Sequence, residues 1–390
     1  MIQNNIYSGS PYGTIPDVNA VPVTQAEPEM SEETAAKLKD PFGNPTEYHE
    51  FRDDYSKILP WIKMSDYKVP LNPARAERSM LSRMYSIGGI CMLLHFLTSQ
   101  VVITIVMLIV QKIISLISGN YDDTMISDYM TQSSILSAMN MMTFVTANSL
   151  FAMLGLKWSK TSHPSLFKTR HFNARYAVQY CIIGLSLWYI TTLISTGIEE
   201  IFQQFGHSII PAGSGDQAVT GMGIAVDLIY GCIMAPVTEE LFFRGMMLRV
   251  LSKANQRFAV FATALFFGLV HGNIPQFVLT FTLGIFLAHI TLKHSSIIPA
   301  IIVHMFINTF ATVVSFLPES TIIEGILNIL LIAALFAGMV LLVIYRRNDR
   351  LPSTTPAQAR RGITIAKTSP AFVASVLVMT ATMALFILIN

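Results

Sequence analysis

Long apolar runs alternate with short polar segments along most of this 390-residue chain. A helix needs about 20 predominantly apolar residues to cross ~30 Å of hydrocarbon, and most of these runs are long enough. The pattern therefore predicts an all-α fold, a polytopic transmembrane helical bundle with about eight or nine spans. The candidate spans are residues 85–116, 134–156, 176–203, 220–252, 257–271, 276–292, 295–316, 321–345 and 370–389.

Residues 1–82 differ from the rest, because they hold 12 of the 24 acidic residues and several prolines. We expect a polar, partly disordered cytoplasmic tail here, with a short amphipathic element around Tyr55–Tyr67. No apolar stretch near Met1 resembles a signal peptide. Residues 83–390 then form the transmembrane domain.

The composition agrees with a membrane protein, since 52% of the residues are hydrophobic and only 13% are charged. Soluble proteins carry roughly 25% charged residues, so an ordinary soluble enzyme is excluded. A net charge of +2, with the basic residues in loops, gives no reason to expect a nucleic-acid partner. Cys91, Cys181 and Cys232 all lie in apolar stretches, which indicates packing rather than a disulfide framework.

Lysine and arginine give an independent test of the topology, because they concentrate in cytoplasmic loops. They occur in the loop 157–175, in the turns near 253 and 293, and between Arg346 and Lys367. The alternate loops at 117–133, 204–219, 272–275 and 317–320 contain none. This alternation predicts an integral membrane protein with a cytoplasmic N-terminus and with Asn390 outside.

Three ionisable residues lie inside the fourth span, where charges are costly and by default mark function. Glu240 and Arg244 are spaced i, i+4, so their side chains can pair on one helical face. Glu239 lies ~100° round the helix from Glu240, without a cation near it in the sequence. The spacing therefore leaves Glu239 as the unpaired acid.

Two further spans contribute polar groups at a similar depth. His271 precedes a helix-breaking segment, Gly272–Pro275, and His304 and Asn308 are again spaced i, i+4. Taken alone, His271 fits a hydrogen-bonded packing residue, and the other pair fits interhelical hydrogen bonding. Measured along their helices from the predicted inside turns, Glu239 lies ~22 Å deep, His271 ~25 Å, His304 ~15 Å and Asn308 ~21 Å. These four side chains can therefore converge near the middle of the membrane.

A carboxylate, two imidazoles and a carboxamide at one depth can form a hydrolytic site. Glu239, helped by His271, could take a proton from water, and the hydroxide would attack a peptide carbonyl. His304 and Asn308 could then donate hydrogen bonds to the oxyanion. Alternatively, Glu239, His271 and His304 could hold a divalent metal such as zinc that activates the water. The spacing alone leaves both mechanisms open.

The motifs EELFFR, FGLVH and HMFIN, which begin at Glu239, Phe267 and His304, resemble those of the CPBP family. That family comprises the glutamate-dependent CAAX prenyl proteases of type II and related Abi-like, bacteriocin-processing or immunity proteins of bacteria. Its pattern is EExxxR, FxxxH and HxxxN in this order, and every specified position matches. The resemblance covers about residues 220–316.

The resemblance implies an intramembrane endopeptidase that acts on membrane-associated, prenylated or bacteriocin-like peptides. It implies that Glu239 activates water with His271, that His304 and Asn308 stabilise the oxyanion, and that Glu240, Arg244 and Phe267 support the site. A metal-free mechanism is favoured, with zinc as the alternative. The apolar, loop-poor chain looks like the bacterial branch, which indicates the bacterial cell membrane and a membrane-associated peptide or protein substrate.

Other readings of the chain are weaker. It contains no HExxH zinc motif. The GxGD string at 213–216 and its conceivable partner Asp122 fall in predicted outer loops, so a paired-aspartate protease is not implied. The pair Glu199–Glu200 has Gln204 where the CPBP pattern has arginine. A transporter, or a non-catalytic membrane immunity or adaptor protein, remains the alternative, although the chain lacks matched interrupted halves and retains all four site residues.

Overall fold

A computed structural model gives the arrangement of most of the chain after the tail. The structure describes residues 73–118, 133–159, 161, 164–167, 172–210, 221–252, 255–318, 320–348 and 356–389. The expected tail element at Tyr55–Tyr67 lies outside these residues. So do the GxGD string at 213–216 and Asp122.

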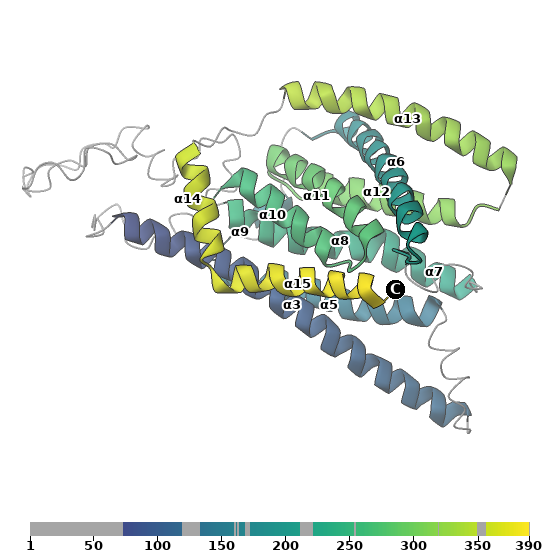
Figure 1. The fold of residues 1–390 in the computed structure, drawn as a ribbon, viewed down its shortest axis with the longest axis horizontal. Coiled ribbons are helices and arrows are strands. Elements are labelled where there is room, and N and C mark those ends of the chain that lie inside the picture. Colours follow the sequence, from purple (N-terminus) through teal and green to yellow (C-terminus); the bar gives the residue numbers. More distant parts are fainter. Residues whose placement is uncertain are drawn as a thin grey trace, which may run out of the picture.

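The described residues contain helices and no strand, so the predicted all-α bundle is confirmed. Each predicted span coincides with one helix or with a run of helical segments (Figure 1). The long helices are α3 (Pro73–Ser118), α5 (Ser133–Trp158), α6 (Ala174–Gln204), α11 (Ile274–His294), α12 (Ile298–Ser315), α13 (Thr321–Asn348) and α15 (Pro370–Ile389). The shorter ones are α7 (Gly221–Ile229), α8 (Ala235–Glu240), α9 (Arg249–Ser252), α10 (Gln256–Leu269) and α14 (Pro356–Lys367).

Six helices in the described part are long and apolar enough to cross a membrane. They lie within α3, α5, α6, α11, α12 and α13. Two shorter apolar helices, Gln256–Leu269 and Pro370–Phe386, account for two more of the predicted spans. The remaining predicted span, 220–252, is a helix interrupted by two π-helical segments.

One helix was not predicted. The segment between Arg346 and Lys367 reads as an inside loop, yet α14 forms within it and runs at a steep angle to α15 (Figure 1). It buries Gly362, Ile365 and Ala366 while Ile363 and Lys367 stay exposed. Its apolar residues are too few and too interspersed for a span, so the hydropathy pattern alone missed this amphipathic helix.

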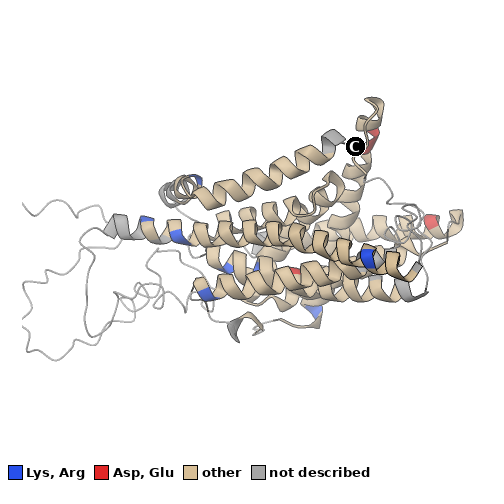
Figure 2. Cartoon of the chain, turned by 90° about the horizontal axis from the view of Figure 1, so that it is seen from below, with Lys and Arg blue, Asp and Glu red and all other residues tan. Residues whose placement is uncertain are grey.

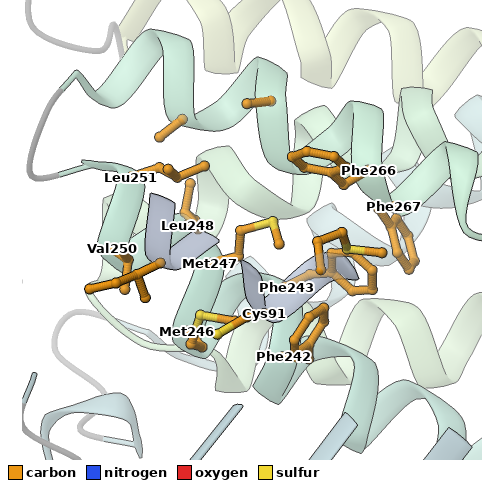
Figure 3. Close-up of a cluster of buried hydrophobic side chains, with 14 of the residues drawn as sticks. Cys91, Phe242, Phe243, Met246, Met247, Leu248, Val250, Leu251, Phe266 and Phe267 are labelled. Atoms are coloured by element: carbon orange, nitrogen blue, oxygen red, sulfur yellow. The ribbon is translucent and has the colours of Figure 1, made fainter. Parts of the chain in front are cut away.

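The apolar core has two parts, on either side of α11 and α12. The larger part surrounds the segment 242–251 with side chains of α3, α5, α10 and α15, and Figure 3 shows its centre. Cys91 and the tightly packed Met246 belong to it. The smaller part joins α6 to α11 and α12, around Tyr180. The helix that carries the acidic motif is therefore held from several sides.

Charges are unevenly distributed over the bundle. In Figure 2, the Lys and Arg positions gather mainly toward one end of the helices, while an acidic position lies within the bundle. This end includes the start of α3 and the turn before α10. The asymmetry follows the alternation of basic and non-basic loops along the sequence.

Candidate functional site

The helix that carries the acidic motif is not regular. A π-helical segment, Tyr230–Met234, precedes the short helix α8, and a second one, Leu241–Leu248, follows it. Pro236 explains the first segment, because proline lacks the N–H that residue 232 would otherwise bond and its ring crowds that carbonyl. The N–H of Ala235 instead bonds the carbonyl of Tyr230. Single π turns inside α-helices are frequent at functional sites, and here they flank the turn that holds Glu239.

Glu240 is the centre of a buried polar network. Its Oε1 accepts hydrogen bonds from Arg244 Nη1 at 2.7 Å and from His304 Nδ1 at 2.9 Å. Arg244 also donates to the carbonyl of Gly284 at 3.3 Å. The side chains of Glu240 and Arg244 are both 0% exposed. The predicted i, i+4 pair is thus present, and it ties α8 to α11 and α12.

Glu239 differs from its neighbour in being accessible. Its side chain is 19% exposed, and its Oε2 lies 3.8 Å from His304 Nε2, outside hydrogen-bond range. His304 therefore faces Glu240 with one ring nitrogen and Glu239 with the other. Of the two adjacent acids, Glu239 is the one that a water molecule or a peptide can reach.

The charges of this cluster can be balanced by a single proton. Two carboxylates and one guanidinium leave one negative charge, and uncompensated buried charge is strongly unfavourable. His304 donates through Nδ1 to Glu240 and turns Nε2 toward Glu239. Glu239 and His304 are therefore the two side chains next to the remaining negative charge, and they do not hydrogen-bond each other at 3.8 Å.

His271 stands at the end of α10, where the predicted helix break is present. Gly272 adopts a positive φ of 73°, which residues with a Cβ rarely adopt, and Asn273 caps the N-terminus of α11. His271 Nδ1 lies 2.7 Å from the carbonyl oxygen of Phe267. A carbonyl only accepts, so Nδ1 carries the hydrogen and Nε2 of the neutral ring is left with a lone pair. This is the tautomer that a general base requires.

Phe267 links the three motifs. Its ring lies 4.3 Å below the guanidinium carbon of Arg244, and its centroid lies 5.3 Å from the ring of His271 and 5.6 Å from the ring of His304. Both imidazoles meet it edge to face. The predicted convergence of the second motif with the first and third is therefore realised through an aromatic side chain.

The side chain of Asn308 also contacts the acidic helix, at a backbone carbonyl of that helix. Its Nδ2 donates to the carbonyl of Gly231 at 2.8 Å. That carbonyl has lost its helical donors, since Ala235 bonds Tyr230 and Pro236 has no N–H. Asn308 supplies the missing hydrogen bond, and its amide keeps a second N–H.

One expected contact and the alternative metal site are not formed directly. Within the described part of the chain, no hydrogen bond or ion pair joins Glu239 to His271. Nor does that part contain three His, Cys, Asp or Glu side chains grouped to hold a metal ion. The alternative zinc ligands Glu239, His271 and His304 therefore do not form such a group in the described residues.

Sequence reasoning missed a second set of buried polar residues beside the site. His95 on α3 bonds Asn148 on α5, and Asn148 bonds Thr238 on α8. The sequence signal was a polar residue, His95 or Asn148, in each of two apolar spans. A polar residue in a span does not by itself show which helix it faces.

The second acidic pair has a local structural role. Glu199 accepts hydrogen bonds from Gln203, from Ser208 and from the backbone N–H of Ile209. It thereby closes the turn after α6.

Comparison with known proteins supports the motif assignment. Residues 221–310 match the family described as Type II CAAX prenyl endopeptidase Rce1-like. The resemblance to this family is confirmed for that segment. A protein of Bacillus subtilis (strain 168) named "Putative membrane peptidase YdiL" is 29% identical over 150 residues. The aligned part covers 36% of this chain and 62% of that relative. No solved structure matches the chain.

The Rce1-like segment contains all the residues of the buried network around Glu240. It begins at α7 and ends within α12, so it spans the two π segments and all three motifs. The helices α3, α5, α6, α13, α14 and α15 lie outside it. Together, the apolar helices and the similarity to this family support an integral membrane protein.

Proposed function

We propose that this protein is an intramembrane endopeptidase in which Glu239 activates water. One observation carries the proposal: Glu239 is accessible, while the adjacent Glu240 is buried and bonded to Arg244 and His304. The site thus contains one acid that is free to act and a second that holds the neighbouring groups. The Rce1-like match over residues 221–310 supports peptide hydrolysis as the reaction.

The proposed reaction begins when water binds between Glu239 and His271. Glu239 accepts a proton from the water, and the hydroxide forms a bond to the carbonyl carbon of a peptide. The negative charge moves to the carbonyl oxygen, where a proton on His304 Nε2 and the second N–H of Asn308 stabilise it. The C–N bond then breaks, and the proton passes to the leaving amine. His271 Nε2, as a free base, can orient the water or relay that proton.

The proposed reaction steps use only side chains of this protein. If zinc were bound, it would lower the pKa of a bound water and polarise the carbonyl, but the residues available to hold it do not form a converging ligand set. We therefore propose the metal-free mechanism. The charge asymmetry supports a cytoplasmic N-terminus. We further propose a bacterial cell membrane as the location and a membrane-associated peptide, prenylated or bacteriocin-like, as the substrate.

Purified wild-type protein and the variants Glu239→Gln and His271→Ala would be assayed on membrane-tethered peptides, with and without a prenyl group. We expect cleavage by the wild type, none by Glu239→Gln, and a rate lower by about 10²- to 10⁴-fold for His271→Ala. Cleavage that survives both changes would overturn the assignment of the site. Failure of the wild type on every peptide, with binding retained, would favour the immunity, adaptor or transporter alternative.

A further inference from the structure

A chain of buried side chains leads from α3 through α5 to the turn that carries Glu239. His95 Nε2 lies 2.8 Å from Asn148 Oδ1, and Asn148 Nδ2 donates to Thr238 Oγ1 at 3.3 Å. All three side chains are buried, with Thr238 the most exposed at 6%. Buried polar groups in proteins are mostly hydrogen-bonded, and here His95 Nε2, Asn148 and Thr238 are, whereas His95 Nδ1 has no partner among the described residues. This chain of side chains ends at the residue next to Glu239.

In the series His95, Asn148 and Thr238, each side chain donates a hydrogen bond to the next group. An amide oxygen only accepts, so His95 Nε2 carries a hydrogen and donates it to Asn148. Asn148 donates to the hydroxyl of Thr238, and the hydroxyl donates in turn to the carbonyl of Met234 at 2.8 Å. The side chain of His95 is thereby connected, through two partners, to the backbone of the acidic helix.

The backbone at this connection is the part of the helix whose geometry matters most. Met234 ends the first π segment, and Thr238 lies in α8, before the second. A threonine that bonds the carbonyl four residues back biases the local bend of a helix. Successive side chains are separated by ~100° of rotation. A small rotation of this turn therefore redirects the Glu239 carboxylate relative to His304, which lies 3.8 Å away.

An aromatic contact path connects His95 to the same site on the other side of the turn. The His95 ring stacks on Phe242 with a centroid distance of 4.7 Å and an interplanar angle of 22°. Phe242 meets Phe243 edge to face at 5.0 Å, and Phe243 meets Phe267 at 5.0 Å (Figure 3). His95 is thus connected to the acidic helix before Glu239 through Asn148, and after Glu239 by direct contact with Phe242.

We propose that His95 and Asn148 are positioning residues, which act through Thr238 to fix the direction of the Glu239 carboxylate. This inference rests on the proposed function, and it adds two residues that lie outside the Rce1-like segment 221–310. In this proposal, α3 and α5 have a role in catalysis as well as in packing. Through His95 and Asn148 they fix the rotation of the turn that carries Thr238 and Glu239, which lies between the two π segments.

The test uses the full-length protein and two pairs of variants. Thr238→Val and His95→Phe keep the size or the stacking surface but remove the hydrogen bond. Thr238→Ser and His95→Gln retain a hydroxyl or an N–H at the bonding atom. Thr191→Val is the matched control, since Thr191 is buried in α6 and its hydroxyl also bonds the carbonyls three and four residues back.

We expect Thr238→Val and His95→Phe to lower kcat by about 10- to 100-fold, because a displacement of ~1 Å in a catalytic group costs that much. KM should change little, and Thr238→Ser and His95→Gln should recover most of kcat. The double variant His95→Phe/Thr238→Val should be no slower than the slower single variant, since both act through one chain. Thr191→Val should keep the wild-type kcat per folded molecule.

Normal kcat in Thr238→Val, together with an inactive Glu239→Gln, would overturn the positioning role and leave the proposed function intact. If Glu239→Gln itself remains active, the proposed function fails, and a second readout tests the positioning alone. That readout is the rate at which dicyclohexylcarbodiimide modifies Glu239, measured by mass spectrometry. It should change in Thr238→Val and not in Thr238→Ser or Thr191→Val, and equal rates in all variants would overturn the inference. If Thr238→Val does not fold, the His95 pair carries the same comparison.

Discussion

The adjacent acids Glu239 and Glu240 should respond in opposite ways to the same substitution. Replacing either with glutamine changes one atom and removes one negative charge. We expect Glu240→Gln to destabilise the fold strongly. Glu239→Gln should leave stability nearly unchanged and abolish turnover.

The magnitude follows from the contacts of the two side chains. Glu240 accepts hydrogen bonds at 2.7 Å from Arg244 and at 2.9 Å from His304, in a fully buried position. Removing one partner of a buried ion pair costs ~3–5 kcal/mol, because it leaves the other charge uncompensated. Glu239 is partly exposed and lies 3.8 Å from His304, so its loss should cost less than ~1 kcal/mol.

The measurement is the unfolding of purified protein in mixed detergent micelles by increasing dodecyl sulfate, followed by far-UV circular dichroism. The double variant Glu240→Gln/Arg244→Met is the control, since it removes both charges and should recover part of the stability lost in Glu240→Gln. Cleavage of the tethered peptides is measured on the same samples at a concentration where each variant is folded.

Two results would refute this reasoning. Equal destabilisation by Glu239→Gln and Glu240→Gln would mean that the buried network does not depend on Glu240 in particular. A stable and fully active Glu239→Gln would mean that the accessible acid has no part in the reaction.

Three further predictions follow from the packing and the polar contacts. Gly338→Ala should lower the free energy of unfolding by about 1–3 kcal/mol, because the new Cβ would overlap Ser186 Cβ on α6. Gly325→Ala on the same helix meets nothing within 4 Å and should be neutral or slightly stabilising. Equal unfolding midpoints for the two variants would contradict the packing of α6 on α13. Asn308→Leu should lower the free energy of unfolding by about 1 kcal/mol, since it leaves the partly buried Gly231 carbonyl without a protein donor. An unchanged unfolding midpoint would show that this bond is not needed. 1,10-Phenanthroline should leave the cleavage rate unchanged relative to its non-chelating 1,7 isomer; selective inhibition would establish metal dependence.

Hydropathy and helical periodicity sufficed for the elements that depend on local properties. The nine apolar runs coincide with helices, because a membrane span is defined by its own composition. The Glu240–Arg244 pair could be predicted for the same reason, since i, i+4 neighbours meet on any helical turn. By contrast, α14 could not be recognised from hydropathy, because its stability comes from burying one face against the bundle.

The contacts between helices could be predicted only in part. Depth matching brought Glu239, His271, His304 and Asn308 to one level, and the structure brings the three motifs together through Phe267 and Glu240. Which nitrogen of His304 faces which acid depends on how α12 is rotated against α8. The spacing of residues within either helix does not determine this rotation.

The π segments explain why the motifs are spaced as they are. Pro236 disrupts the hydrogen bonding of the acidic helix one turn before Glu239 and leaves the carbonyl of Gly231 without a helical donor. Asn308 supplies that donor, and one turn away on the same helix His304 bonds Glu240. The i, i+4 spacing of His304 and Asn308 thus matches Glu240 in α8 and Gly231 in the first π segment, which lie on either side of Pro236. A motif that reads as two catalytic residues therefore also holds the irregular backbone in place. For this reason, loss of activity in an Asn308 variant counts as loss of an oxyanion ligand only after the fold around Gly231 is shown to be intact.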